Sequence, residues 1–536
     1  MKINKLFGEV SRMGQYVNPG NRNFQISRNS EIYVDKSMLI EKTNAALDTE
    51  KRFICVSRPR RFGKTMAANM LAAYYGRNQD ASPLFDDLVI ATSKDYKLHL
   101  NQHDVIMLNI QTFLSRSANV TEMLDLLRKK VSEELMKAHP EIIYGQPEDF
   151  MEVMFDTFHH TQQPFVILLD EWDCLFREYK GDLEAQKEYL DFLRLWLKGQ
   201  PYVGLAYMTG ILPIKKYGSH SALNMFSEFS MTSPRQFIND FGFTASEVKA
   251  LAHKYKVDFE EIKKWYNGYF TDREMPIYNP TAVVESLMSK EFESYWSNTE
   301  TYEALKDYIK LDLGNLKEKV TELIADGEIK IEIRRFANDM TSIYAADDVL
   351  TLLVHLGYLT YNSAEQSVRI PNKEVKAEFI AAIKSLKWEH VTASLKEADT
   401  VLNGIWQKDT EQITKTLGKI HQRSASILKY NDENSLSMTL NLALYTAVDY
   451  YTVLRELPSG KGFADLVYLP RKKHLDKPAL VIELKWDQSA KGAISQIKEK
   501  QYLKSLSEYR GNLLLIGINY DRQSKNYECV IEEDIL

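Results

Sequence analysis

A short apolar run, a basic loop and an alanine-rich stretch follow one another near the start of the chain. The run RFICVS at Arg52–Ser57 has the β-branched and aromatic residues of a strand, and MAANMLAAYYG, after the loop RPRRFGKT, favours a helix. Backbone N–H groups at such a loop and at the helix N-terminus point toward a bound phosphate, and the helix dipole favours negative charge. This order therefore predicts a phosphate-binding loop in an α/β fold.

The loop departs from the usual spacing GxxxxGK[ST] at its first position. The first glycine would fall at position 58, where this chain has Arg58. In the usual arrangement Lys64 reaches the β and γ phosphates and Thr65 binds Mg²⁺. A basic strand-to-helix turn that happens to contain GKT is the structural alternative. The loop residues that we assign to a nucleotide are Arg60, Arg61, Phe62, Gly63, Lys64 and Thr65.

A second apolar run, FVILL at Phe165–Leu169, ends in the acidic string Asp170, Glu171, Trp172, Asp173. Ligands of an open α/β sheet bind at the carboxyl ends of its strands, so Asp170 can hold Mg²⁺ through water while Glu171 orients an attacking water. A cap of the next helix is a plausible explanation of Asp173. A helix cap explains Asp170 and Glu171 poorly, because neighbouring carboxylates repel each other unless a cation or a hydrogen-bond donor compensates.

Two further apolar runs, VIMLNI at Val105–Ile110 and VGLAYM at Val203–Met208, are expected as strands of the same sheet. Thr209 follows the second run and is placed to sense the γ phosphate, although a turn that ends the strand explains it nearly as well. Strands that alternate with helices indicate a parallel sheet with crossover connections.

Four strings together resemble the AAA-ATPase-like family of bacteria. They are YVDKS at Tyr33–Ser37, RPRRFGKT at Arg58–Thr65, LLDEWD at Leu168–Asp173 and FGFTASEV at Phe241–Val248. That family tolerates the arginine at position 58. The resemblance implies that the nucleotide is ATP, and it identifies no arginine finger.

The middle of the chain is helical and rich in aromatic residues, with WYNGYF at Trp265–Phe270 and YNPTAVVESL from Tyr278. Core packing of a helical lid explains these aromatic residues better than base stacking does. Asn279 or Thr281 is expected to cap the next helix. Residues 340–385 predict a helix, a hairpin and a helix, an order that resembles a winged helix, and its low basic content favours a regulatory role over DNA contact.

The last hundred or so residues predict a helix that Glu433 opens, three strands, a helix from about Ala490 and a further strand. The side-chain period of two puts Glu483 and Lys485 on one face of the strand at Ala479–Trp486. Asp465 lies on the preceding strand and can face them. Phosphodiester hydrolysis uses such a set, in which carboxylates hold Mg²⁺ or Mn²⁺ and a lysine orients water.

In this hypothesis Asp465, Glu483 and the carbonyl of Leu484 are the metal ligands, Lys485 positions the nucleophile, and Glu433 adds an outer or second-metal contact. A structural ion pair between Glu483 and Lys485 is the alternative. It is a weak one, because burying such a pair costs several kcal/mol of desolvation.

This segment resembles the PD-(D/E)XK nuclease superfamily, in the version fused behind AAA-ATPase-like domains. The matching residues are Glu433, GFADLVYLP at Gly462–Pro470, ELKW at Glu483–Trp486, Gln496 and Tyr502. The resemblance implies that Gln496 assists near the site. The basic run at 471–474 can hold a DNA backbone, but a solvated hairpin tip explains it as well.

Length and composition set the limits of the prediction. A chain of 536 residues is expected to hold several domains, and it contains no apolar run long enough to cross a bilayer. The N-terminus lacks the apolar stretch of a secretory signal, so we expect a cytoplasmic protein. Its three cysteines have no metal-binding spacing, and its net charge of -6 neither supports nor excludes a DNA partner.

We therefore predict a multidomain α/β protein in five parts: a P-loop domain (1–243), a helical lid (244–335), a winged-helix-like module (336–385), a helical connector (386–429) and a restriction-endonuclease-like α/β domain (430–536). The first functional hypothesis is an ATP-regulated, metal-dependent nuclease that acts on nucleic acid, DNA above all. The second is a nucleotide-dependent switch or scaffold whose nuclease fold binds nucleic acid or a partner without cleavage. Sequence leaves the oligomeric state open, with a homo-oligomer among the options.

Overall fold

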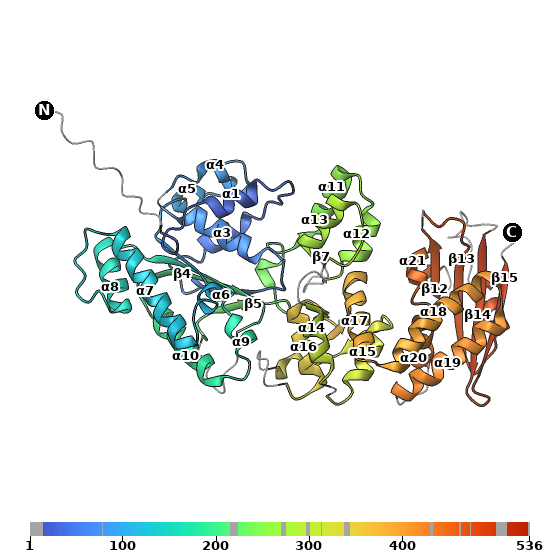
Figure 1. Ribbon diagram of the computed structural model, residues 1–536. Helices are drawn as coiled ribbons and strands as arrows, with labels where there is room; N and C mark the ends of the chain where they lie inside the picture. Colours follow the sequence, from blue (N-terminus) through green and yellow to red (C-terminus); the bar gives the residue numbers. More distant parts are fainter. Residues whose placement is uncertain are drawn as a thin grey trace. The chain divides into compact units, whose positions relative to one another are not determined.

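The computed structural model describes residues 14–77, 79–214, 223–269, 275–295, 301–311, 313–336, 343–428, 433–459, 462–471, 473–499 and 512–533. The chain divides into two compact units, residues 1–298 with 330–375 and residues 299–329 with 376–536 (Figure 1). Both units contain helices and a five-stranded sheet, which confirms the predicted α/β class. The five-part division of the chain stays a prediction.

The sheet of the first unit has the strand order β2-β3-β4-β1-β5, and the strands pair in parallel. The four apolar runs of the sequence are all strands of it, whereas β5 carries no comparable apolar signal. The strands are β1 (Phe53–Ser57), β2 (Val105–Asn109), β3 (Phe165–Asp170), β4 (Val203–Gly210) and β5 (Ser227–Phe229).

Every residue of β1, β3 and β4 is buried, as expected for parallel strands with both faces covered. Their register brings polar residues together at the carboxyl edge of the sheet. Asp170 pairs with Asn109 of β2 on one side and with Thr209 of β4 on the other. Ser57, which precedes the loop, pairs with Gly210.

Helices cover the sheet of the first unit, with α3 packed against β2, β3 and β4, and α7 beside α8 and α10 (Figure 1). The helical segments of this part are α1 (Arg22–Arg28), α2 (Met38–Asn44), α3 (Lys64–Tyr75), α4 (Ser82–Phe85), η1 (Val89–Thr92), α5 (Tyr96–His99), α6 (Ile110–Leu114), α7 (Val120–Ala138), α8 (Phe150–Thr161), α9 (Cys174–Glu178), α10 (Leu183–Leu197) and η2 (Arg235–Phe237).

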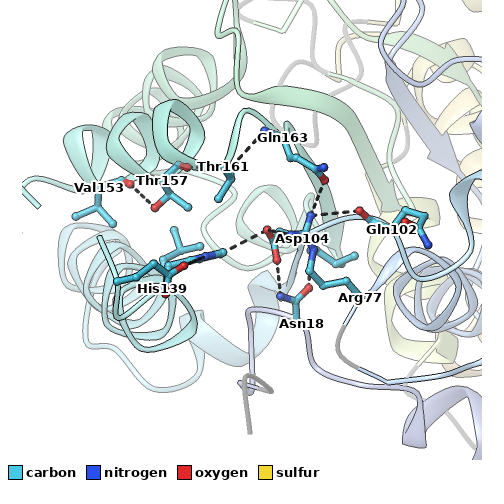
Figure 2. A network of polar contacts seen from close by, with 12 residues as sticks. Asn18, Arg77, Gln102, Asp104, His139, Val153, Thr157, Thr161 and Gln163 are labelled. Atoms are coloured by element: carbon cyan, nitrogen blue, oxygen red, sulfur yellow. Dashed lines mark hydrogen bonds and ion pairs between the residues drawn. The ribbon is translucent and has the colours of Figure 1, made fainter. Parts of the chain in front are cut away.

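A buried polar cluster lies at the N-terminal end of β2, opposite the end that carries Asn109 (Figure 2). The carboxylate of Asp104, just before β2, accepts a hydrogen bond from Asn18 Nδ2 at 2.8 Å. It also forms ion pairs with Arg77 at 3.4 Å and with His139, at the end of α7, at 3.5 Å. Because the four side chains come from four separate segments, the cluster joins the N-terminal segment, the end of α3, β2 and α7.

A helical group follows the first sheet, and aromatic residues such as Tyr266 and Tyr278 lie in its core, as predicted, whereas its role as a lid stays a prediction. Asn279 caps its last helix through hydrogen bonds from Thr281 N and Ala282 N, which confirms one of the two expected caps. The elements are β6 (Phe243–Thr244), α11 (Ala245–Tyr255), α12 (Phe259–Tyr266), β7 (Ile277–Tyr278) and α13 (Pro280–Ser289).

The predicted helix, hairpin and helix are present. Tyr269 from the helical group donates a hydrogen bond to the carbonyl of Gly357 at the end of the first of these helices, at 3.0 Å. The elements are β8 (Ile329–Lys330), η3 (Ile333–Arg335), α16 (Ala346–Leu356), β9 (Thr360–Asn362), β10 (Ser367–Arg369) and α17 (Lys373–Ser385).

The second unit contains a mixed sheet with the order β11-β12-β13-β14-β15 (Figure 1). Helix α22 packs on β13, β14 and β15, and α19 packs on β15 and on α18 and α20. The elements are α14 (Thr301–Ile309), α15 (Leu316–Ile324), α18 (Glu389–Gln407), α19 (Thr410–Leu428), α20 (Glu433–Ala443), α21 (Ala447–Tyr450), β11 (Tyr451–Ser459), β12 (Gly462–Pro470), β13 (Ala479–Trp486), α22 (Ala490–Glu499), β14 (Leu513–Asp521) and β15 (Asn526–Glu533).

All four predicted C-terminal strands are present, and β15 is an addition that sequence analysis did not anticipate. Within the described ranges, no helix has the length and apolar character that a membrane span requires.

Candidate functional sites

The predicted phosphate-binding loop leads from β1 into α3, which begins at Lys64. Gly63, just before the helix, has a φ of 90°, in the left-handed region that glycine adopts without strain. Thr65, in the first turn, donates a hydrogen bond from Oγ1 to Oδ2 of Asp170 at 2.8 Å. The structure therefore brings the loop and the carboxyl end of β3 together, as the sequence predicted.

Lys64 is only 5% exposed, and its ammonium donates to the carbonyl oxygen of Pro59 in the same loop at 2.9 Å. Burial lowers the pKa of Lys64, while the negative charges of Glu171 and Asp170 act in the opposite direction. The lysine thus lies among the predicted carboxylates, with its charged end inside the curve of the loop.

Arg58, at the position of the missing glycine, is buried and turns away from the loop. Its guanidinium donates to the carbonyl oxygens of Ser57, Phe229 and Phe237, at 2.9, 2.8 and 3.2 Å. Burial lowers the pKa of Arg58 to about 10. The Arg58 side chain therefore connects the start of the loop to β5 and η2 through hydrogen bonds.

Phe62 is 2% exposed, and its ring lies perpendicular to that of Tyr269, with centroids 5.2 Å apart. Its carbonyl accepts a hydrogen bond from Gly242 N at 3.1 Å. Arg60 is partly buried and Arg61 is exposed, and the φ of Arg61 is 67°. A role of Arg60, Arg61 and Phe62 in nucleotide binding stays a prediction. Because the Phe62 ring is buried against Tyr269, its backbone N–H is the group that can contact a nucleotide.

Asp170 is fully buried, and burial raises its pKa. Its Oδ2 accepts hydrogen bonds from Thr65 and from Asn109 Nδ2, the latter at 3.2 Å. Its Oδ1 is buried without a hydrogen-bond partner, and so is Oγ1 of the adjacent Thr209. Buried oxygen atoms of this kind are costly unless something binds them, and a carboxylate beside a hydroxyl suits Mg²⁺. The residues present therefore fit a Mg²⁺–nucleotide complex.

Glu171 and Asp173 share one cation, Arg177 of α9. Arg177 forms a hydrogen bond and ion pair through Nη2 with Glu171 Oε2, and its Nε lies 3.3 Å from Asp173 Oδ2. Asp173 accepts hydrogen bonds from Ile211 N at 3.1 Å and Leu212 N at 2.8 Å, just beyond β4, and it makes no side-chain cap bond to α9. Although burial acts against it, the two carboxylates raise the pKa of Arg177.

The second site lies on β13, where Glu483 is 1% exposed. Lys485 donates to Glu483 Oε1 at 3.3 Å and to Gln496 Oε1 at 2.5 Å. Gln496, on α22, donates through Nε2 to Glu483 Oε1. The strand and the helix thus bring three predicted residues into one closed set of hydrogen bonds, in which Gln496 contacts both charged groups.

Several predicted residues of this site lie outside what the structure describes. Tyr502 is one of them, and so are the side chains of Glu433, at the start of α20, and of Asp465, in β12 next to Leu466, which pairs with Ile482. Leu484 is half-buried in β13, and a metal contact of its carbonyl stays a prediction. Among the described side chains, no three His, Cys, Asp or Glu residues lie close enough together to bind a metal ion. Of the carboxylates predicted for this second site, Glu483 is therefore the one whose side chain the structure describes.

In the basic run after β12, Arg471 donates to the carbonyl of Tyr451 at 3.1 Å. The neighbouring Lys472 lies outside the described residues.

Sequence analysis missed Asn109 and Arg177 as site residues. Asn109 ends an apolar strand beside Asp170, and a polar residue at a predicted strand end was a signal that could have found it. Arg177 lies four residues after Asp173 on a helix, a spacing that places the two side chains on one face.

The comparisons with known proteins match an N-terminal and a C-terminal part of the chain to two family models. Residues 20–219 match the family model described as predicted AAA-ATPase, and residues 432–529 match that of the PD-(D/E)XK nuclease superfamily. An uncharacterized protein in the vnfD 5′ region of Azotobacter chroococcum mcd 1 is 24% identical over 380 residues, which are 65% of this chain and 67% of that protein. The solved structure of the Aeropyrum pernix ORC2 protein, in ADPNP–ADP complexes, matches with 11% identity and a TM-score of 0.30, over 69% of this chain and 98% of that one.

The fold and the two family models indicate a nucleotide-binding α/β domain and a nuclease-like domain in one chain. In family terms, the chain carries a predicted AAA-ATPase domain and a C-terminal domain of the PD-(D/E)XK nuclease superfamily, as the sequence predicted.

Proposed function

We propose that the first unit binds ATP with Mg²⁺ and hydrolyses it to ADP and phosphate. The hydrogen bond between Thr65 and Asp170 carries this proposal, because it joins the loop to the strand end that a Mg²⁺–triphosphate complex must bridge. The buried Oδ1 of Asp170 and Oγ1 of Thr209 support it further.

Each residue has a role that follows from its position. The N-terminus of α3 and the Lys64 ammonium bind the phosphates, and Lys64 exchanges its contact with Pro59 for phosphate oxygens. Thr65 and Asp170 would hold Mg²⁺, which neutralises charge on the phosphate oxygens. Glu171 accepts a hydrogen bond from the attacking water, and Thr209 contacts the γ phosphate.

Phosphate release from ATP tests this proposal. Lys64→Ala and Asp170→Asn are expected to lower the turnover number by about 100-fold or more, because each removes charge stabilisation at the transferred phosphate. Lys97→Ala is the matched control, since Lys97 forms an exposed ion pair with Asp86 in the same unit and should retain the wild-type rate. Equal phosphate release by all four proteins would refute the proposal.

We further propose that the second unit cleaves phosphodiester bonds of DNA. The closed set of hydrogen bonds among Glu483, Lys485 and Gln496 favours this function over a purely structural ion pair. A structural pair needs no third polar residue from α22, whereas a reactive lysine must be held in one orientation.

In cleavage, a water oxygen attacks phosphorus and loses a proton, while the bond from phosphorus to the leaving oxygen breaks and that oxygen takes up a proton. Glu483 and the carbonyl of Leu484, with Asp465 from β12, would hold Mg²⁺ or Mn²⁺, which supplies charge stabilisation when bound. Lys485 orients the attacking water, and Gln496 fixes the direction of the Lys485 ammonium.

A gel assay of cleavage tests this function with single- and double-stranded DNA, with Mg²⁺ or Mn²⁺, and with or without ATP. Glu483→Ala and Lys485→Ala are expected to lower the rate of cleavage by about 10²-fold or more. Lys498→Ala, which removes an ion pair with Glu532 at the surface of α22, is the control that should cleave normally. ATP hydrolysis without cleavage of any substrate would instead support a nucleotide-dependent switch or scaffold.

A further inference from the structure

The buried guanidinium of Arg177 connects the end of the sheet to Glu171. Its side chain is 13% exposed, and it contacts Glu171 and Asp173 together. Asp173 is itself fixed by two backbone N–H groups just beyond β4. A continuous series of contacts therefore runs from the residues just beyond β4 through Asp173 and Arg177 to the carboxylate of Glu171.

We propose that Arg177 is a positioning residue for ATP hydrolysis, which holds Glu171 through Oε2 so that Oε1 faces the attacking water. The inference rests on the proposed ATPase function and extends it to a residue outside the phosphate-binding motifs. The contact of Arg177 with Glu171 runs from Nη2 to Oε2. A bond to one oxygen restrains the carboxylate and leaves the second oxygen for the water.

The backbone of Glu171 explains why such a holder is needed. Its φ of 53° lies in the left-handed region, which costs a non-glycine residue about 1 kcal/mol or more. This turn directs the side chain away from the path that an extended strand would give it. Glu171 is also 23% exposed, so packing alone does not fix its rotamer. A cation anchored to the sheet supplies the missing constraint.

A purely structural role for Arg177 makes a different prediction. In that case the guanidinium only neutralises Glu171 and Asp173, and its removal would lower stability without a specific effect on turnover. A guanidinium that touches the phosphates would instead raise the KM for ATP. A positioning residue lowers kcat, leaves KM near its original value and has no effect once Glu171 cannot act.

The experiment measures ATP hydrolysis and nucleotide affinity for wild type, Arg177→Ala, Arg177→Lys, Glu171→Gln and the double variant E171Q/R177A. Arg177→Ala is expected to lower kcat about 10- to 100-fold while KM changes less than about twofold, since misplacement by about 1 Å has this effect. Arg177→Lys should recover part of the loss. The double variant should match Glu171→Gln, because Arg177 acts through Glu171.

Added guanidinium ion supplies a further readout. It should restore part of the activity of Arg177→Ala and none of that of the double variant. Arg194→Ala is the matched control, since Arg194 forms an exposed pair with Asp191 on α10. If Arg177→Ala fails to fold, Arg177→Gln, which retains polar volume, and Arg177→Lys decide the question by the same comparison.

The outcomes separate this inference from the proposed function. Unchanged or increased kcat in Arg177→Ala, a rise in KM alone, or an additive further loss in the double variant overturns the role of Arg177 while ATP hydrolysis stands. Equal turnover by wild type and Lys64→Ala refutes the ATPase proposal, and this inference falls with it.

Discussion

Replacement of Gly517 by alanine tests how α22 is placed over the second site. Gly517 of β14 pairs with Glu483 of β13, and α22 crosses directly above it. A Cβ atom at Gly517 would lie 2.2 Å from the carbonyl oxygen of Ala490 and 3.1 Å from Cβ of Ala493. Ordinary contacts begin at 3.4 Å, so the start of α22 must retreat by about 1.2 Å.

The retreat has two measurable consequences. Overpacking of this size costs about 1–3 kcal/mol of folding free energy. The same movement carries Gln496 away from Glu483 and Lys485, and a misplacement of about 1 Å at a reactive group costs about 10²-fold in rate. Gly517→Ala should therefore lower both the unfolding temperature and the rate of DNA cleavage, although residue 517 has no side chain in the site.

Thermal unfolding and the cleavage assay measure the two effects side by side. Gly418→Ala in α19 is the matched control, because a Cβ atom there meets nothing within 4 Å. It should raise stability by about 0.5–1 kcal/mol, the usual gain for this change within a helix. Wild-type stability and cleavage in Gly517→Ala would refute the close packing of α22 on β14.

Further predictions concern the first unit. Gly210→Ala places a Cβ atom 2.5 Å from Asp173 Oδ1, so it should disturb the acidic turn and reduce ATP hydrolysis, as phosphate release will show. Arg58→Gly restores the usual loop motif yet should lower the unfolding temperature. It removes the hydrogen-bond donor of buried carbonyl groups, and each group left without a partner costs about 1–3 kcal/mol of folding free energy. The hydrogen bond and ion pair with Asp104 raise the pKa of His139. The stabilisation of the folded state by this pair is therefore complete below the ordinary histidine pKa, and it is lost as the pH rises through the pKa of His139 in the folded protein. Thermal unfolding should thus show wild type losing more stability than His139→Gln between pH 6 and pH 9, and equal losses would contradict the ion pair.

The sequence predicted those structural elements that depend on the pattern of neighbouring residues. Strands β1, β3 and β4 of the first sheet are continuous apolar runs, and buried parallel strands give this signal without reference to the rest of the fold. The meeting of Thr65 and Asp170 was also predictable, because parallel strands place their carboxyl ends at one edge of the sheet.

The features that sequence did not predict depend on distant partners. The guanidinium of Arg58 is held by carbonyls about 170 to 180 residues away in the chain, so nothing near position 58 indicates that it is buried. Of the residues in strand β15 only Cys529 is buried, so the segment resembles a polar tail in sequence although it pairs with β14. The contact of Arg177 with Glu171 required the left-handed turn at Glu171, which the sequence does not encode in a recognisable form.

The central claim is that the chain holds two separate reactive sites, one for ATP and one for phosphodiester bonds. Purified Glu483→Gln, incubated with DNA, ATP and Mg²⁺, tests it when phosphate release and DNA products are measured in one reaction. We predict ATP hydrolysis at the wild-type rate without DNA cleavage, since Glu483 lies on β13 of the second unit and Lys64 on α3 of the first. Cleavage that persists in this variant, or ATP hydrolysis that disappears with it, would contradict the claim.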